Sequence, residues 1–224
     1  MPPPTSWTPP SAGLRVEPFR GVRYAPGRVA DLAAVTSPPY DVVDADEAGR
    51  LERLDPHNVV HLILPRASSG DTGSRYESAR RMLDDWLADG TLLADDGHSL
   101  YVYEQTPVGG TPHVGILAGV GVAPADEAAI LPHEHVMPGP IADRFDLMRA
   151  ARTNLEPILL AYCGGDRDDA RRGGGGARQL IERVVDMPAL IDVVAEDGSR
   201  HRIWHTGTPR ITAPSATTSR TGPP

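Results

Sequence analysis

Apolar residues recur at helical spacing in four stretches of the chain, residues 44–54, 74–89, 141–152 and 177–185. In residues 74–89 they fall on one stripe, and Gly90 follows at the place where helices commonly end on a glycine. Asp44 and Glu47 have the spacing of a capping box, and Pro140 is suited to a first helical turn. The pattern therefore predicts four helices.

Shorter apolar or alternating runs predict β-strands at residues 14–24, 58–64, 101–105, 113–122, 155–162, 190–195 and 200–206. Asp197-Gly198 separates the last two runs, and this dipeptide between alternating apolar residues is a strong hairpin signal. Gly109-Gly110 supplies a turn between the third and fourth runs, whereas Pro157 weakens the fifth as a strand. We expect an α+β fold: a mixed, largely antiparallel sheet with three or four helices.

The two ends of the chain lack this periodicity. Residues 1–13 are rich in Pro, Ser and Thr, and residues 207–224 contain almost no large apolar side chain. Segments of this composition cannot bury enough apolar surface to offset the entropy of ordering. We expect a disordered lead-in over residues 1–13, one domain over residues 14–206 and a disordered tail over residues 207–224.

Charge and composition argue against some classes of binding partner and some cellular locations. The chain of 224 residues has a formal net charge of −8, and all 22 of its basic residues are arginine. This balance makes nucleic acid an unlikely partner and argues against electrostatic attachment to a membrane. The single cysteine, Cys163, excludes an intrachain disulfide, and the first residues lack the features of a secretory signal. We expect a cytoplasmic protein.

Residues 36–43, TSPPYDVV, form a stiff segment with three polar side chains. Adjacent prolines fix φ at two positions and bias the preceding residues toward extended backbone. The segment is either a rigid turn or a scaffold that presents Ser37, Tyr40 and Asp41 at the edge of a cleft. The residues alone leave both alternatives open.

The densest group of polar residues lies in residues 131–157. In an extended backbone His133 and His135 point to one face, as in a histidine pair that grips a metal, with Asp143 or Asp146 as a third ligand. We weigh this against general acid–base chemistry by His133, Glu134 and His135, which we prefer. We therefore expect no metal site.

Arginines in the same region suit an anion. Arg149 and Arg152 lie three residues apart on one predicted helix face, Arg144 lies on an adjacent face, and Asn154 follows at the helix end. A guanidinium group can donate two parallel hydrogen bonds to two phosphate oxygens. These side chains are therefore candidates for phosphate or substrate binding. An ordinary solvated helix, with Asp146 and Arg149 as a salt bridge, explains the spacing equally well.

Asn58 and His61 open the predicted strand at residues 58–64. Polar residues at the entry to a buried strand usually bind backbone groups, and we favour that role for both. They remain secondary candidates for substrate binding.

Six segments, in the same order along the chain, resemble those of a bacterial and archaeal family filed as the domain of unknown function numbered 1015, often labelled as SpoOJ/ParA/ParB/RepB-family proteins. They are SPPYDVV at residues 37–43, NVVHLILP at 58–65, YVYEQT at 101–106, PHEHVMP at 132–138, DRFDLMRAARTNLEPILLAY at 143–162 and DGSRHRIWHT at 197–206. Members of that family are about twice as long and carry a ParB-like Gly-His-His-Arg-Tyr motif after the last segment. This chain has an unpatterned tail there instead, so we expect an N-terminal portion of the family architecture that is inactive alone.

The resemblance implies a function class. The ParB-like superfamily includes kinases of free serine, so the family suggests phosphoryl transfer to a small hydroxy compound, with a nucleotide or pyrophosphate as donor. It also suggests a phosphate or nucleotide ligand and a separately encoded C-terminal half as a partner. The alternative is a non-catalytic ParB-like protein with a regulatory or DNA-partitioning role.

Overall fold

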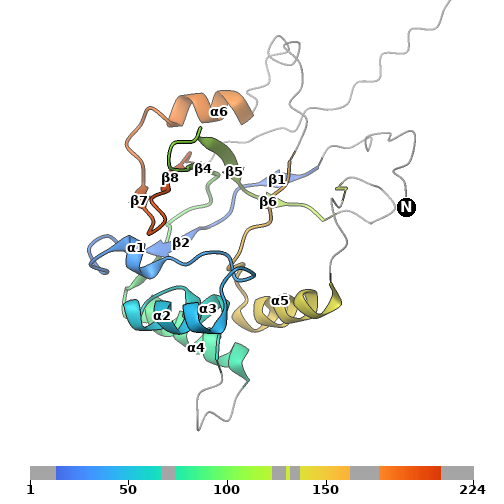
Figure 1. The fold of residues 1–224 in the computed structure, drawn as a ribbon. Helices are drawn as coiled ribbons and strands as arrows, with labels where there is room; N and C mark the ends of the chain where they lie inside the picture. Colours follow the sequence, from blue (N-terminus) through green and yellow to red (C-terminus); the bar gives the residue numbers. More distant parts are fainter. Residues whose placement is uncertain (1–13, 67–73, 123–129, 132–136, 162–176, 208–224) are drawn as a thin grey trace, which may run out of the picture.

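The computed structural model describes residues 14–66, 74–122, 130–131, 137–161 and 177–207 (Figure 1). Five helices, α1 to α5, lie together on one side of the molecule, and a four-stranded sheet covered by α6 lies on the other. We call the group α2 to α5 the helical lobe, and the four-stranded sheet with α6 the sheet lobe.

The helical lobe contains α2 (Ala45–Leu54), α3 (Val60–Ile63), α4 (Arg75–Ala88) and α5 (Pro138–Ala151), and α1 (Leu32–Val35) precedes it. Side chains cap the first turns of α2 and α4, at Asp44 as predicted and at Ser74, which the pattern did not single out. Asp44 accepts hydrogen bonds from the backbone N–H groups of Asp46 and Glu47, and Ser74 forms a complete capping box with Glu77. Gly90, with φ of 79°, follows α4 in the left-handed region that favours glycine.

The sheet lobe is an antiparallel sheet in the order β5-β4-β8-β7. Its strands are β4 (Tyr101–Thr106), β5 (His113–Leu117), β7 (Ile191–Val194) and β8 (Arg200–His205), and α6 (Ala177–Val184) covers it. Gly198, with φ of 81°, makes the turn between β7 and β8. The hairpin expected from Asp197-Gly198 is thus confirmed.

Two small antiparallel ladders complete the described structure. β1 (Val16–Glu17) pairs with β6 (Gly119–Val120), and β2 (Val22–Tyr24) pairs with β3 (Leu92–Ala94). The sheet content is therefore divided among three separate sheets. All the described strand pairs are antiparallel, and the expected α+β class is confirmed.

Each lobe has its own apolar core. In the helical lobe Leu62, Leu83 and Trp86 form one cluster together with Leu92 of β3, and Ala48, Leu51 and Val60 form a second. In the sheet lobe Val102, Val184 and Trp204 pack together. Burial of these side chains is the main force that fixes α3 and α4 against each other and α6 on the sheet.

Four strand predictions need correction. The run at residues 58–64 is not a strand, because Val60–Ile63 form the short helix α3. The run at residues 155–162 has no strand in its described part, residues 155–161. The stretches 14–24 and 113–122 each contain two short strands instead of one. A short apolar run fits a buried helix as well as a strand, and packing of α3 under α4 decides the first case.

Among the described residues, no helix combines the length and the apolar character needed to cross a membrane.

Candidate functional site

Asn58 holds the backbone that leads into the proline-rich segment. Its side chain is fully buried, and its amide nitrogen donates to the carbonyl oxygens of Ala34 and Thr36, each at 2.8 Å. Its amide oxygen accepts the N–H of Val60 at 2.9 Å. One side chain therefore ties the end of α1 to the start of α3. These contacts give Asn58 the backbone-binding role that its position favoured.

Tyr40 is the polar side chain of the proline-rich segment that contacts α5. The guanidinium carbon of Arg144 lies over its ring, 4.2 Å from the centroid, which is a cation–π contact. Ser37 instead donates to the carbonyl of its neighbour Pro38 at 2.6 Å, and Asp41 is exposed. The structure thus brings Tyr40 and Arg144 together and leaves Asp41 at the surface.

Arg144 is the centre of a polar network that joins three parts of the chain. Its Nε and Nη2 both donate to Asp143, and its Nη1 donates to the carbonyl of Ile63 at 2.7 Å and to Glu156 at 3.2 Å. Asp143 also accepts a hydrogen bond from the Tyr76 hydroxyl at 2.8 Å. All three guanidinium nitrogens of Arg144 are used, so here this side chain anchors α5 to α3 and to residues 36–43.

The surroundings of Asp143 keep it charged. Partial burial alone would raise the pKa of its carboxyl group, but hydrogen bonds from Arg144 and Tyr76 and the charges of Arg144 and Arg75 outweigh burial, so the pKa lies below its ordinary value. The ionised carboxylate is the form that binds both arginines.

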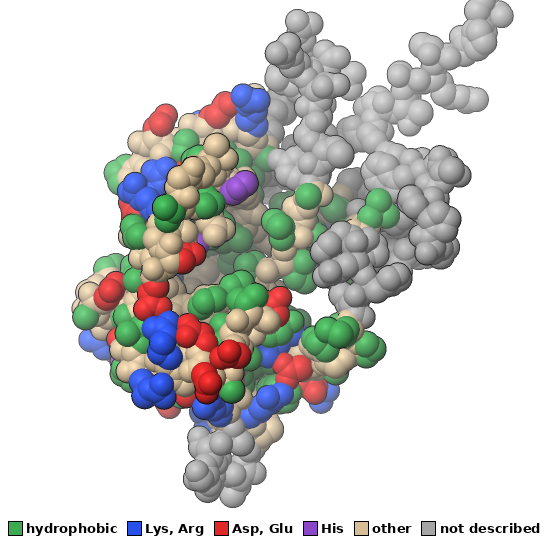
Figure 2. Space-filling view, viewed as in Figure 1, with side chains coloured by type: hydrophobic (Ala, Val, Ile, Leu, Met, Phe, Trp, Pro, Cys, Tyr) green, Lys and Arg blue, Asp and Glu red, His purple; other side chains and the backbone are tan. Residues whose placement is uncertain are grey.

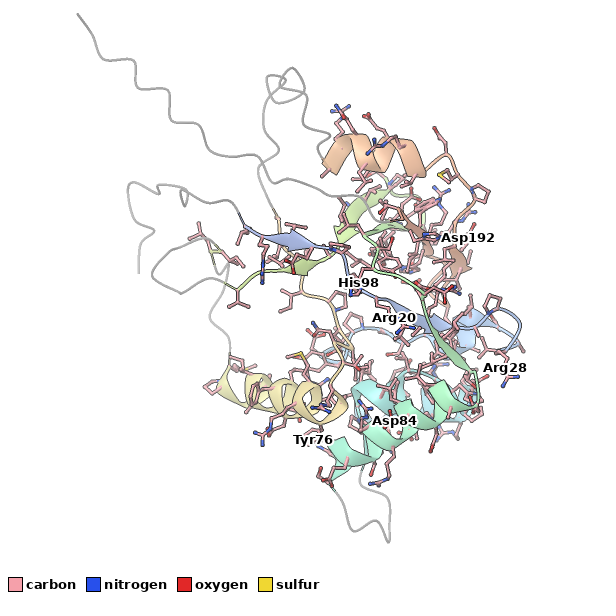
Figure 3. All side chains as sticks on the ribbon, turned by 180° about the vertical axis from the view of Figure 1, so that it is seen from behind. Arg20, Arg28, Tyr76, Asp84, His98 and Asp192 are labelled. Atoms are coloured by element: carbon pink, nitrogen blue, oxygen red, sulfur yellow. The ribbon has the colours of Figure 1, made fainter. Side chains whose placement is uncertain are left out.

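A groove of about 600 Å³ runs between α4 and α5, beside this network. Its lining residues are Ser74, Tyr76, Glu77, Arg80, Arg81, Asp146, Arg149 and Ala150. Figure 3 shows Tyr76 at the end of α4 that approaches α5, with Asp84 farther along the same helix. Because Tyr76 lines the groove and also binds Asp143, the groove and the Arg144 network share a wall.

The arginines of the groove differ in how far they are engaged. Arg80 donates to Asp84 at 2.7 Å and to the carbonyl of Ala151 at 2.8 Å, so it joins α4 to the end of α5. Arg81 donates to Ser78 at 3.0 Å. Arg149 is exposed and has no hydrogen bond or ion pair with another described residue, and the salt bridge with Asp146 that its spacing allowed is not formed.

The remaining candidates lie apart from the groove lining. Arg152 ends α5 with φ of 53° and is exposed, as is Asn154. His61 lines a second, smaller hollow of about 210 Å³ with Glu52 and Arg66. His133, Glu134 and His135 lie outside the described residues, so their placement stays a prediction.

The α4 side of the groove does not follow from the sequence pattern. Tyr76, Arg80 and Arg81 lie in the predicted helix 74–89, where only the apolar stripe received attention. Tyr76 belongs to the apolar stripe, which predicts a core side chain, and Arg80 lies next to it around the helix. The pattern does not show that these side chains meet α5. Glu156 lies in the predicted strand 155–162, and its contact with Arg144 depends on tertiary packing.

In the sheet lobe, unlike in the groove, the polar side chains of each cluster bind one another. Tyr103 and Ser199 bind the two ring nitrogens of His201 at 2.7 and 2.8 Å, and Ser199 donates to Asp197 at 2.6 Å. Glu104, only 6% exposed, accepts from Arg202. These groups satisfy one another, as expected of structural networks.

Within the ranges that the structure describes, no group of three or more His, Cys, Asp or Glu side chains could hold a metal ion. The candidate metal ligands His133 and His135 lie outside those ranges.

The fold and groove define a mixed α+β protein with a candidate anion-binding groove between two helices. The family model described as Protein of unknown function (DUF1015) matches residues 16–216, and the chain belongs to this family. No curated protein and no solved structure matches the chain.

Proposed function

We propose that this chain takes part in phosphoryl transfer to a small hydroxy compound such as free serine, and that the α4–α5 groove holds a phosphate group. The observation that carries this proposal is Arg149. Its guanidinium lies at the groove and has no partner among the described residues. An unengaged arginine beside a groove is suited to paired hydrogen bonds with phosphate oxygens.

The dimensions and charge of the groove support a small anionic ligand. About 600 Å³ is within the range of pockets for small molecules. The lining carries the positive charges of Arg80, Arg81 and Arg149 against the negative charges of Glu77 and Asp146, so three minus two leaves one net positive charge. This local sign is opposite to the net charge of −8 of the chain.

The Arg144 network gives the groove a fixed wall. Arg144 binds Ile63 and Glu156, stacks on Tyr40, and through Asp143 is linked to Tyr76 on α4. A wall that is fixed before the ligand arrives lowers the entropy cost of binding, so that Arg149 is the side chain that becomes ordered on binding. We assign Tyr40 and Arg144 this positioning role, and Arg149 direct contact.

The proposed reaction transfers the terminal phosphoryl group of a nucleotide or pyrophosphate to the hydroxyl oxygen of the acceptor. The bond from that oxygen to phosphorus forms, the bond to the leaving phosphate breaks, and the hydroxyl proton passes to a base. His133, Glu134 and His135, which precede α5 in the sequence, are the proposed acid–base residues.

Calorimetric titration with pyrophosphate and with ATP tests the groove. We expect Arg149→Ala to weaken binding at least about tenfold, since a hydrogen bond to a charged group contributes ~1.5–3 kcal/mol. Arg183→Ala is the matched control, because Arg183 is an exposed arginine on α6. Equal affinities of the two variants, or no binding by the parent chain, would refute the groove as the phosphate site.

An assay of serine phosphorylation tests the activity. It is run on the chain alone and with any polypeptide encoded directly downstream, because we also propose a separately encoded second half as a partner. Phosphoserine formed only with both polypeptides supports the complete proposal. Binding of duplex DNA in place of phosphate compounds would instead support a DNA-partitioning role, against which the net negative charge argues.

A further inference from the structure

Helix α5 carries an apolar stripe that nothing in the described structure covers. Ile141, Phe145 and Met148 are 50%, 56% and 43% exposed, and Met137, just before the helix, is 70% exposed. Their spacing of four, four and three residues places them along one side of α5. Figure 2 shows apolar side chains gathered over this helix.

A second side of α5, about 100° around the helix from the stripe, is also apolar. Leu147 and Ala151 are each 1% exposed, packed toward the rest of the helical lobe. A helix with apolar residues on two neighbouring sides is typical of one that packs against protein on both of them. Phe145 sharpens the point: of the two phenylalanines in the chain, Phe19 packs on Tyr101 at 5.0 Å between ring centroids, and Phe145 is more than half exposed.

The rest of the chain offers little that could cover the stripe. Outside the described residues, the large apolar side chains are few: Met1, Trp7, Val136, Tyr162, Cys163 and Ile211. They are scattered over four segments, and no two of those in the terminal segments are near neighbours in sequence. An apolar surface one helix long calls for several apolar side chains at regular spacing. None of these segments has apolar side chains at that spacing.

Charges around the stripe indicate the chemistry of that molecule. Arg149 and Arg152 lie four residues beyond Phe145 and Met148, so both flank or extend the stripe. The two acidic residues of α5 are turned elsewhere, since Asp143 binds Arg144 and Asp146 lines the groove. The surface is thus apolar with a positive border and no carboxylate from α5 of its own.

We propose that the α5 stripe binds an amphipathic helix of a partner polypeptide whose apolar side is bordered by acidic residues. A second copy of this chain fits poorly. Antiparallel pairing of two α5 helices places Arg152 near the positive N-terminal end of the other helix, and parallel pairing sets arginine against arginine. A membrane surface fits poorly too, because the chain has a net charge of −8 and the stripe is narrow.

A synthetic helical peptide tests the proposal. α5 has 14 residues and spans about 21 Å at ~1.5 Å per residue, so a peptide of about 15 residues with a leucine stripe matches it. One version carries glutamates beside the leucines, and the other carries lysines. We expect the glutamate version to bind the full chain at least about tenfold more tightly in fluorescence anisotropy.

Two variants locate the binding. Phe145→Ser should weaken the glutamate peptide at least about tenfold, whereas Leu54→Ser, which changes a side chain of α2 that is 43% exposed, should not. Arg152→Glu should reverse the preference between the two peptides. Thermal unfolding confirms that each variant is folded.

Three results would overturn the proposal. The first is equal affinity for both peptides or equal loss in both serine variants. The second is self-association of the parent chain in sedimentation that Phe145→Ser abolishes, which assigns the stripe to a second copy. The third is flotation of the chain with phosphatidylglycerol vesicles that Phe145→Ser abolishes, which assigns it to a membrane.

Discussion

The two lobes differ in how completely their polar and apolar side chains find partners within the fold. In the sheet lobe Glu104 is buried and paired with Arg202, and His201 is bound through both ring nitrogens. In the helical lobe the Arg144 network leaves one buried oxygen of Glu156, Oε1, without a hydrogen-bond partner. The neighbouring groove and the stripe on α5 leave Arg149 and Phe145 without partners among the described residues. Groups that satisfy one another stabilise a fold, whereas uncommitted groups are available to ligands and partners.

The largest expected effect on stability is at Asn58, because its side chain is fully buried and bonded to backbone groups. Asn58→Ala removes two bonds to backbone carbonyls and leaves the N–H of Val60 unpaired. We expect a loss of about 2–4 kcal/mol in the free energy of unfolding, measured in urea. Asn154→Ala, at an exposed position, should change it by less than ~0.5 kcal/mol. A similar, small loss in both variants would show that the Asn58 contacts contribute little.

Substitution of Glu104 tests whether the buried ion pair of the sheet lobe stabilises the fold. Glu104→Gln keeps the shape of the side chain but removes the charge that binds Arg202. We expect a loss of about 2 kcal/mol in unfolding free energy, less than for a fully buried pair because the Arg202 side chain is 29% exposed. An unchanged urea midpoint would mean that solvent replaces the pair without cost.

The pH dependence of the unfolding free energy tests the contribution of the Arg144 network. The pKa of Asp143 is lowered in the folded state, so the folded protein binds fewer protons there than the unfolded chain does. The resulting stability is present above the unfolded pKa of ~3.9 and is lost as the pH falls through the lower folded pKa. Asp143→Asn should lower the stability at pH 7 by about 1–2 kcal/mol and flatten its decrease below about pH 4. Parallel curves for the variant and the parent chain would exclude this contribution.

The smallest expected effect is in the groove. Asp146 lies at the groove without an ion pair to any other residue that the structure describes. Asp146→Asn should change the unfolding free energy by less than ~0.5 kcal/mol, and it should strengthen pyrophosphate binding because it removes a negative charge from the lining. Loss of stability comparable to that of Glu104→Gln would remove the distinction between the lobes.

Sequence patterns predicted the elements better than the site. Ser74, Gly90 and Asp197-Gly198 act through local backbone geometry, so the ends of α4 and the last hairpin followed from neighbouring residues. The helix α3 was mistaken for a strand, because a mostly apolar run of this length has no period that separates the two.

The candidate site depends on contacts between elements that are distant in sequence. Tyr40 and Arg144 were both candidates, but only tertiary packing shows that they stack on each other. The same packing places Arg80 of α4 on the last carbonyl of α5. Spacing along one helix could not reveal that Arg149 lies at the groove while Arg144 faces inward.

Arg149 stands between the groove and the stripe, and this position ties the two proposed binding events to one charge. A phosphate bound to Arg149 neutralises the guanidinium that an acidic partner helix would otherwise meet. The two ligands are therefore antagonists, and thermodynamic reciprocity requires each to weaken the other by the same factor. Through this single side chain, phosphate binding in the groove lowers the affinity of α5 for the partner helix.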